Sequence, residues 1–319
     1  MAVIEEILIN VTPQETRVAV IEHGVTQEVH IERASARGLV GNIYMGRVIR
    51  VLPGMQSAFI DIGGGRRAAF LHVADIWEHR HNGDSATPIE KLLAEGQTLM
   101  VQVVKDPIGT KGARLSTQIS IAGRFLVYLP QESHIGISQR IEDQEERAHL
   151  RGKLQQLLPP DEKGGFIIRT TAEAASDREL KSDVDYLRRL WGGIQDKAAT
   201  AAPLTPLYQD LNLGLRVLRD FVHEETVRIL VDSRETYQEM IEFGQDFTPN
   251  VAERIEHYHG ERPVFDLYGV EDEIEKALAR RVELKSGGYL IIDQTEALTT
   301  LDVNTGGFVG GRSFDDTIF

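Results

Sequence analysis

The sequence of 319 residues contains no cysteine. This absence excludes disulfide bonds and thiolate zinc sites within these residues. Long hydrophobic runs are also missing, since no apolar stretch approaches the roughly 20 residues that a membrane-spanning helix needs. The first residues, MAVIEEILINVTPQ, lack the basic head and small-residue cleavage site of a secretory signal. We therefore expect a cytoplasmic protein.

Positive charge is scarce as well. The chain carries 35 Lys and Arg against 49 Asp and Glu, a net charge of −14, whereas binding to nucleic acid depends on Lys and Arg. From residue 36 to residue 125, however, 11 Lys and Arg meet 7 Asp and Glu, a net of +4 that leaves −18 for the rest. One basic module on an acidic body is compatible with RNA binding. Ordinary fluctuation of charge along a chain explains the difference equally well.

Apolar residues make up 41% of the chain, which at this length supports the cores of two or three domains. Residues 5–33 alternate apolar and polar positions around a turn at His23-Gly24, and this pattern predicts a β-meander. The segment GGFIIRTT predicts another strand, and residues 199–206 are the best candidate for a linker. Helical spacing predicts helices over 142–158, 177–198, 208–230 and 270–284. The fold class is therefore α+β with several domains.

Five strand patterns follow one another between Gly41 and Ser120. Gly and Pro separate them, and one longer polar connection interrupts them at about 79–88. Five short strands with one long loop predict a small barrel of the oligonucleotide-binding type.

Two aromatic residues fall on the polar face of this predicted barrel. In MQSAFIDIG, alternation places Phe59 opposite the core positions, and in RRAAFLHV it does the same for Phe70. Exposed aromatic rings on such a barrel stack on bases, and the nearby Lys105, Lys111 and Arg114 could contact phosphates. The alternative is a one-residue bulge that returns either Phe to the core.

The segment GGFIIRTTAEAA places Arg169 and Thr170 at the end of an apolar strand, before a helix-prone stretch. A guanidinium offers a forked pair of donors to phosphate, and a hydroxyl adds another. From the residues alone, a surface ion pair with a helix cap is the more common arrangement.

The last strand pattern, LTTLDVN, places Asp302 and Asn304 side by side on one face. Carboxylate and amide oxygens suit a hard Mg²⁺ ion that keeps several waters, and such an ion can activate water at a phosphodiester. Capping of a strand end that enters a Gly turn explains the same two residues without a metal.

Several longer motifs resemble the bacterial ribonuclease E/G family. GNIYMGRVIRVLPGMQSAFIDIG, AAFLHVAD and VKDPIGTKGARLSTQIS are similar to its S1 domain. The resemblance implies that Phe59, Phe70, Lys105 and Lys111 contact single-stranded RNA. It also implies that Arg169 and Thr170 bind the 5′-monophosphate of the RNA, with Gly123 and Val127 of IAGRFLVYLP packed beside them.

The segment SGGYLIIDQTEALTTLDVNTGGF resembles the catalytic signature of the same family. There, the Asp that corresponds to Asp302 is a ligand of Mg²⁺, and the Asn that corresponds to Asn304 positions the neighbouring group. A second metal-binding Asp, in a motif like IIIDFIDM, and a later Zn²⁺ link between protomers have no counterpart here. We therefore expect this chain to be an N-terminal portion that is inactive alone, and the full-length protein to be a homo-oligomer.

The resemblance implies a domain division as well. An RNase H-like subdomain would comprise 1–35 and 216–280, an S1 domain 36–125, a 5′-sensor region 126–215, and the start of a DNase I-like catalytic domain 281–319. The first segment, NVTPQETRVAVIEHGVTQEVHIER, is closer to the ribonuclease G branch than to ribonuclease E. The implied function is Mg²⁺-assisted cleavage of single-stranded RNA, in rRNA maturation and mRNA decay. A non-catalytic S1-type RNA-binding scaffold is the alternative.

Overall fold

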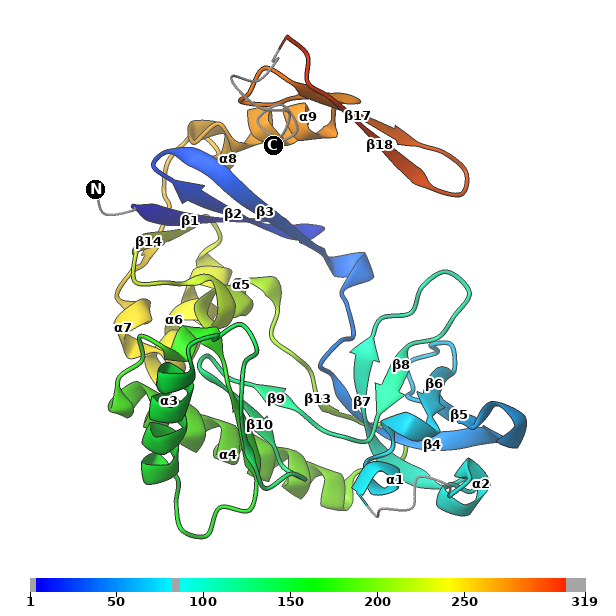
Figure 1. The fold of residues 1–319 in the computed structure, drawn as a ribbon. Coiled ribbons are helices and arrows are strands. Elements are labelled where there is room, and N and C mark those ends of the chain that lie inside the picture. The colour runs from blue at the N-terminus through cyan, green and yellow to red at the C-terminus, as the bar shows by residue number, and fades with distance from the viewer. Residues whose placement is uncertain (1–3, 82–86, 308–319) are drawn as a thin grey trace.

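The computed structural model describes residues 4–81 and 87–307, and it shows a mixed α+β protein with four sheets (Figure 1). The predicted α+β class is confirmed. Part of the predicted connection at 79–88 and the last residues of the predicted catalytic segment, 308–319, lie outside the described residues. No helix within the described ranges is long and apolar enough to span a membrane.

The first sheet joins the N-terminal strands to strands that come more than 190 residues later in the chain. The predicted meander is present as β1 (Glu5–Val11), β2 (Glu15–Glu22) and β3 (Val25–Arg33), and β1 pairs in parallel with a much later strand, β14 (Thr226–Val231). The sheet has the order β15-β14-β1-β2-β3, with β15 at Ile255–His257. The centre of β1 is buried on both faces because helices cover both faces of the sheet. These helices are α5 (Leu213–Arg216) and α6 (Arg234–Phe247) on one side, and α8 (Val264–Leu267) and α9 (Val270–Leu278) on the other.

The prediction of one helix over 208–230 is wrong. Helix α5 is followed by a π-helical turn at Val217–Phe221, and the run TVRILV forms β14. This run is short, β-branched and apolar, which is typical of a buried parallel strand, and helical periodicity cannot distinguish it from a buried helix. The predicted helix over 270–284 also ends early, at Leu278, and β16 (Arg281–Glu283) follows.

The predicted five-stranded barrel is present. Its strands are β4 (Ile43–Leu52), β5 (Ser57–Asp61), β6 (Ala69–His72), β7 (Thr98–Lys105) and β8 (Arg114–Ser116). Pairing of β4 with β7 closes the sheet, so the barrel is OB-like. The predicted linker 199–206 is shorter than expected, because α4 runs to Thr200 and Pro206 begins β13 (Pro206–Tyr208), which pairs with β4. Two short helices, α1 (Trp77–His81) and α2 (Ile89–Leu92), flank the barrel.

A third sheet lies beside the barrel (Figure 1). It consists of β9 (Ile121–Ala122), β10 (Leu126–Leu129), β11 (Ile135–Ile137) and β12 (Gly165–Ile168). One face packs on α3 (Gln144–Leu157) and α4 (Asp177–Thr200), the two helices predicted at 142–158 and 177–198. A capping box of Ser176 and Glu179 begins α4.

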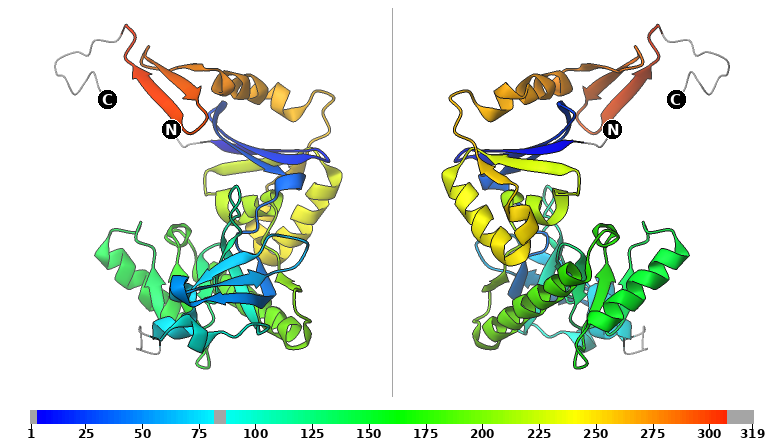
Figure 2. Two further views of the ribbon diagram at one scale, coloured as in Figure 1. Left: turned by 90° about the vertical axis from the view of Figure 1, so that its right-hand side faces the viewer. Right: turned by 90° about the vertical axis from the view of Figure 1, so that its left-hand side faces the viewer.

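The chain ends in a small sheet of β16, β17 (Tyr289–Gln294) and β18 (Thr299–Asn304), the predicted terminal hairpin. Figures 1 and 2 show this sheet at one end of the molecule, beyond α9, and the barrel at the opposite end. Asp302 and the predicted RNA-binding residues of the barrel therefore belong to different sheets.

Candidate functional site

The barrel carries a row of aromatic and basic side chains across its outer face. Phe59 of β5 is the register partner of Phe70 of β6, which in turn is the partner of Arg114 of β8. Arg50 of β4 pairs with Phe59, and Lys105 of β7 pairs with Arg114, so the row extends at both ends. Register partners on neighbouring strands project to the same face. Five strands thus form one continuous stripe of two rings between cations.

Both phenylalanines face outward, as predicted. Their chain neighbours Ala58, Ile60 and Leu71 are fully buried in the barrel core, while the two Phe rings are half-buried. The ring centroids lie 6.3 Å apart in an edge-to-face arrangement. Pairing of β5 with β6 is regular. The alternative of a bulge that returns one Phe to the core is therefore wrong.

The cations of the stripe, and Lys111 near it, differ in exposure and in whether a carboxylate binds them. Lys105 and Lys111 are exposed, Lys111 on the β7–β8 connection, where its N–H donates to the carbonyl of Ile108. Arg114 is committed to Asp75, with its Nε and Nη2 atoms 2.9 and 2.8 Å from Oδ2. Arg50 is exposed and had not been singled out from the sequence. Its position opposite Phe59 depends on a bulge between Val48 and Arg50 that alternation does not reveal.

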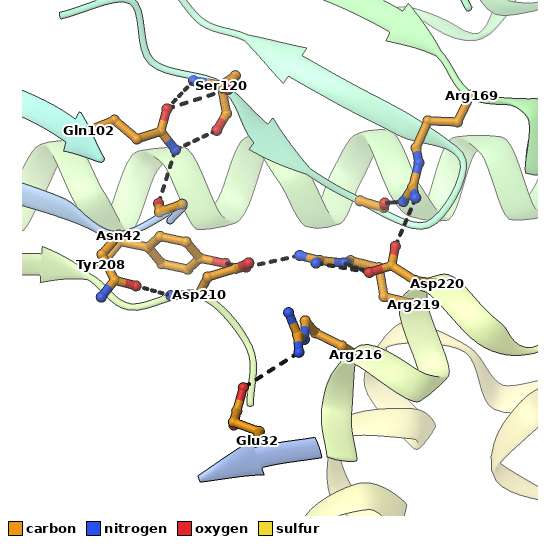
Figure 3. A network of polar contacts seen from close by, with 12 residues as sticks. Glu32, Asn42, Gln102, Ser120, Arg169, Tyr208, Asp210, Arg216, Arg219 and Asp220 are labelled. Atoms are coloured by element: carbon orange, nitrogen blue, oxygen red, sulfur yellow. Dashed lines mark hydrogen bonds and ion pairs between the residues drawn. The ribbon is translucent and has the colours of Figure 1, made fainter. Parts of the chain in front are cut away.

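The predicted phosphate-binding residues meet at the edge of the third sheet. Val127 pairs with Ile167, and Arg169 follows two residues later, so Val127 and Arg169 project from the same face, opposite α3 and α4. The Nη1 atom of Arg169 donates to the carbonyl oxygen of Gly123 over 2.6 Å. Its Nη2 atom donates to Oδ1 of Asp220 over 2.8 Å (Figure 3). The structure brings Gly123, Val127 and Arg169 together and adds Asp220, which sequence reasoning missed.

Glycine is required at position 123 because the Asp183 side chain of α4 lies close to its backbone. A Cβ atom at this position would lie 2.5 and 2.6 Å from the carboxylate oxygens of Asp183 on α4. That carboxylate accepts backbone N–H bonds from Arg124, Phe125 and Leu126 at 3.1, 2.9 and 2.9 Å. Burial raises the pKa of Asp183 to about 6, although the three N–H donors act in the opposite direction. Asp183 thereby fixes the turn that presents the Gly123 carbonyl to Arg169.

Thr170 begins a short 3-10 turn, Thr170–Ala172, and is half-buried. Within the described part of the chain its hydroxyl makes no hydrogen bond, whereas the next hydroxyl, of Thr171, donates to the carbonyl of Arg124 over 2.7 Å. Thr170 also lines a cavity of about 310 Å³. Its wall includes one arginine, Arg124, and four glutamates, Glu173, Glu179, Glu224 and Glu225, so acidic residues predominate. A phosphate is disfavoured inside this cavity, so Arg169 and Thr170 would meet one outside it.

At the other end of the molecule, Asp302 and Asn304 lie side by side on β18. The Nδ2 atom of Asn304 donates to Oδ2 of Asp302 over 3.1 Å. Most of β18 is exposed, including Leu301 and Val303 on the opposite face. The predicted adjacency is thus present, on a strand with little packing around it.

The oxygens of these two residues fit one side of a Mg²⁺ site. The bond to Asn304 uses one carboxylate oxygen, which leaves Oδ1 of Asp302 and the amide oxygen of Asn304 as oxygen donors of the kind that Mg²⁺ prefers. Among residues 4–81 and 87–307, no three His, Cys, Asp or Glu side chains gather into a group that could hold a metal ion by itself. Asp302 and Asn304 together fit an ion that takes most of its ligands from water and substrate oxygens.

Comparison of the sequence with known proteins shows which family it is similar to. The model of the "Ribonuclease E/G family" matches residues 120–319. The chain belongs to the ribonuclease E/G family. It is 54% identical to ribonuclease G of Escherichia coli (strain K12) over 98% of this chain and 65% of that relative. Ribonuclease G of Haemophilus influenzae is 50% identical over the same shares, and ribonuclease E of Nostoc sp. is 34% identical over 97% of this chain and 44% of that relative.

This family member spans slightly less than two thirds of the length of the ribonuclease G relatives. The assignment to the ribonuclease E/G family is confirmed, and the greater identity is with the relatives named ribonuclease G.

Proposed function

We propose that this chain forms the RNA-binding and 5′-end-recognising part of an endoribonuclease that cleaves single-stranded RNA with Mg²⁺. The observation that carries the proposal is the stripe across the barrel, in which Phe59 and Phe70 lie in register between Arg50 and Lys105. Rings that stack on bases, flanked by cations that follow a phosphate backbone, suit a single strand of any sequence.

We also propose the domain division that the resemblance implies, and the sheet topology is compatible with it. Strands from 1–35 and from 216–280 share one sheet, as an RNase H-like subdomain split by an insertion requires. The inserted portion contains both the barrel, as the S1 domain, and the sheet that carries Arg169. The hairpin of Asp302 begins the proposed DNase I-like domain.

In the proposed reaction, Mg²⁺ when bound would supply charge stabilisation and an activated water at the scissile phosphate. Asp302 would hold the ion through its carboxylate, and the hydrogen bond from Asn304 would fix the orientation of that carboxylate. The barrel would hold the strand by stacking and by phosphate contacts. Arg169 and Thr170 would bind the 5′-monophosphate. We further propose that the protein acts in the cytoplasm on rRNA precursors and mRNA, as a homo-oligomer.

A non-catalytic scaffold is the second candidate. It is favoured by one observation, that within the described residues no group of three or more His, Cys, Asp or Glu side chains includes Asp302. Both candidates share the RNA-binding stripe, so they differ only in the chemistry at Asp302.

Binding of a fluorescent single-stranded oligonucleotide with a 5′-hydroxyl, followed by anisotropy, tests the stripe. Phe59→Ala removes one stacking ring, which is worth about 1–3 kcal/mol, and should weaken binding by about 5- to 150-fold. Arg50→Ala should weaken binding and reduce the dependence of log Kd on log salt by about one phosphate contact. Arg33→Ala is the matched control, since Arg33 is an exposed arginine on β3, outside the barrel. Equal Kd values for Arg50→Ala and Arg33→Ala, with Phe59→Ala like wild type, would refute the proposal.

A further inference from the structure

Arg169 is the first member of a chain of charged groups that runs from the third sheet to the barrel (Figure 3). Asp220 accepts from Arg169 with Oδ1 and from Arg219 with Oδ2, the latter through Nε at 3.1 Å and Nη2 at 3.0 Å. The Nη1 atom of Arg219 then donates to Oδ1 of Asp210 over 2.9 Å. The backbone N–H of Asp210 donates to Oδ1 of Asn42, just before the barrel strand β4. Two carboxylates and two guanidinium groups alternate along this path.

Arg219 and Asp220 are consecutive residues of the π-helical turn Val217–Phe221. In an α-helix, the side chains of consecutive residues point about 100° apart. Here, the N–H of Val222 donates to the carbonyl of Val217. Within the turn, the guanidinium of Arg219 donates two hydrogen bonds to the carboxylate of Asp220. Such turns occur frequently at functional sites. The turn therefore orients the carboxylate of Asp220 toward both Arg219 and Arg169.

Asp220 is held firmly on the side of Arg219. The Arg219 side chain is only 8% exposed and is bonded to carboxylates on both sides, whereas that of Arg169 is 27% exposed. Burial alone would raise the pKa of Asp220, but the charge of Arg219 and the bonds from both arginines lower it below its usual range. The carboxylate is ionised at neutral pH and has a fixed place. By contrast, the guanidinium of Arg169 has no carboxylate partner other than Asp220 among the described residues.

We infer that Asp220 is a positioning residue that aims the guanidinium of Arg169 at a terminal phosphate, and this inference rests on the proposed 5′-end recognition. A guanidinium has five N–H donors. The bonds to Gly123 and Asp220 use one donor on each Nη atom and fix the plane of the group. The remaining donors are then available in a fixed orientation, which lowers the entropic cost of binding a phosphate.

For Asp220→Asn, the positioning role predicts a definite direction of change in phosphate binding, namely a loss. The amide has one oxygen where the carboxylate has two, so one of the two arginines must face an NH₂ group. Because buried Arg219 cannot turn to water and partly exposed Arg169 can, the oxygen remains with Arg219. Arg169 is thereby released from its orientation. If Asp220 merely weakened the positive charge of Arg169, the same substitution would strengthen phosphate binding instead.

The test compares Kd values for one oligonucleotide with a 5′-monophosphate and with a 5′-hydroxyl. We expect wild type to prefer the monophosphate by about tenfold or more, the effect of one charge-assisted hydrogen bond. Arg169→Ala should abolish this preference, and Asp220→Asn should reduce it to less than about twofold, with Kd for the 5′-hydroxyl form unchanged. Asp210→Asn is the matched control, because it removes the same charge from the same chain without touching Arg169. It should keep the wild-type preference.

Asp220→Glu is a second variant that keeps the charge and displaces the carboxylate by one methylene. It should also reduce the preference, which a pure effect of charge would not do. Equal loss in Asp210→Asn, tighter monophosphate binding by Asp220→Asn, or wild-type preference in Asp220→Glu would each overturn the assignment of Asp220. Preference that survives Arg169→Ala, or that is missing in wild type, would overturn the proposed 5′-end recognition itself.

Discussion

Replacement of Gly123 by alanine tests whether the turn beneath Arg169 is as tightly packed as the structure indicates. The added Cβ would lie 2.5 and 2.6 Å from the two carboxylate oxygens of Asp183, and 2.8 Å from its Cγ. The carboxylate is only 4% exposed and is anchored by three backbone N–H groups at 2.9 to 3.1 Å, so it cannot swing aside freely. A shift of about 0.9 Å, from 2.5 Å to 3.4 Å, is needed to reach an ordinary contact distance.

The magnitude follows from what that shift breaks. Overpacking of a tight interior costs about 1–3 kcal/mol, and loss of one hydrogen bond to a buried charged group costs about 1.5–3 kcal/mol. We therefore expect Gly123→Ala to lower the free energy of unfolding by about 3–5 kcal/mol, a large part of the roughly 5–15 kcal/mol typical of a folded protein.

Urea denaturation followed by far-UV circular dichroism measures this loss, and Gly152→Ala is its matched control. Gly152 lies within α3, where a Cβ would meet no atom within 4 Å. Alanine there should raise the free energy of unfolding by about 0.5–1 kcal/mol, because glycine is a poor helix former. A Gly123→Ala variant within 1 kcal/mol of wild type, with an unchanged m-value, would show that Asp183 does not pack against this glycine.

Two further predictions concern Asp183 and Asp302. Because burial raises the pKa of Asp183 to about 6 in the folded protein, its contribution to stability is present below its unfolded value of about 3.9. That contribution is lost as pH rises through 6, a decline of about 3 kcal/mol. The difference in free energy of unfolding between wild type and Asp183→Asn should fall by that amount from pH 4 to pH 7, and a constant difference would contradict the raised pKa. From the proposed function, we expect Asp302→Asn to abolish Mg²⁺-dependent cleavage with RNA binding retained. Undiminished cleavage would place the catalysis elsewhere.

The predictable parts of this protein are those whose chemistry is local in the sequence. Alternation alone placed Phe59 and Phe70 on the outer face, because the two strands contain no bulge and their neighbours are small or branched apolar residues. The same reasoning placed Asp302 beside Asn304, which the hydrogen bond between them confirms. The roles of these residues in binding and cleavage remain proposals.

The parts that were missed depend on contacts between distant segments. Asp220 reaches Arg169 across 51 residues, and it does so from a π-helical turn whose backbone pattern leaves no sign in the hydrophobic periodicity. The strand β14 was mistaken for helix because its burial is decided by β1, more than 200 residues away. Of these missed features, only Asp183 could have been found from the sequence. It lies among Leu180, Val184 and Leu187, on the buried face of α4, where a carboxylate must find hydrogen-bond donors.

The elements proposed to bind RNA and the element proposed to cleave it differ in how firmly the surrounding described residues hold them. Arg169 is fixed by a backbone carbonyl and by Asp220, and the turn beneath it is anchored by a buried carboxylate. Phe59 and Phe70 extend from a closed barrel with a fully buried core. Asp302 lies on an exposed strand, with Asn304 as its only hydrogen-bond partner within residues 4–81 and 87–307. Catalysis requires groups that are held rigidly by a surrounding shell, whereas binding of a flexible strand tolerates separate, individually anchored contacts. RNA affinity and 5′-end preference can therefore be measured on this chain independently of cleavage, which is why the experiments on Phe59, Arg50 and Asp220 read out binding.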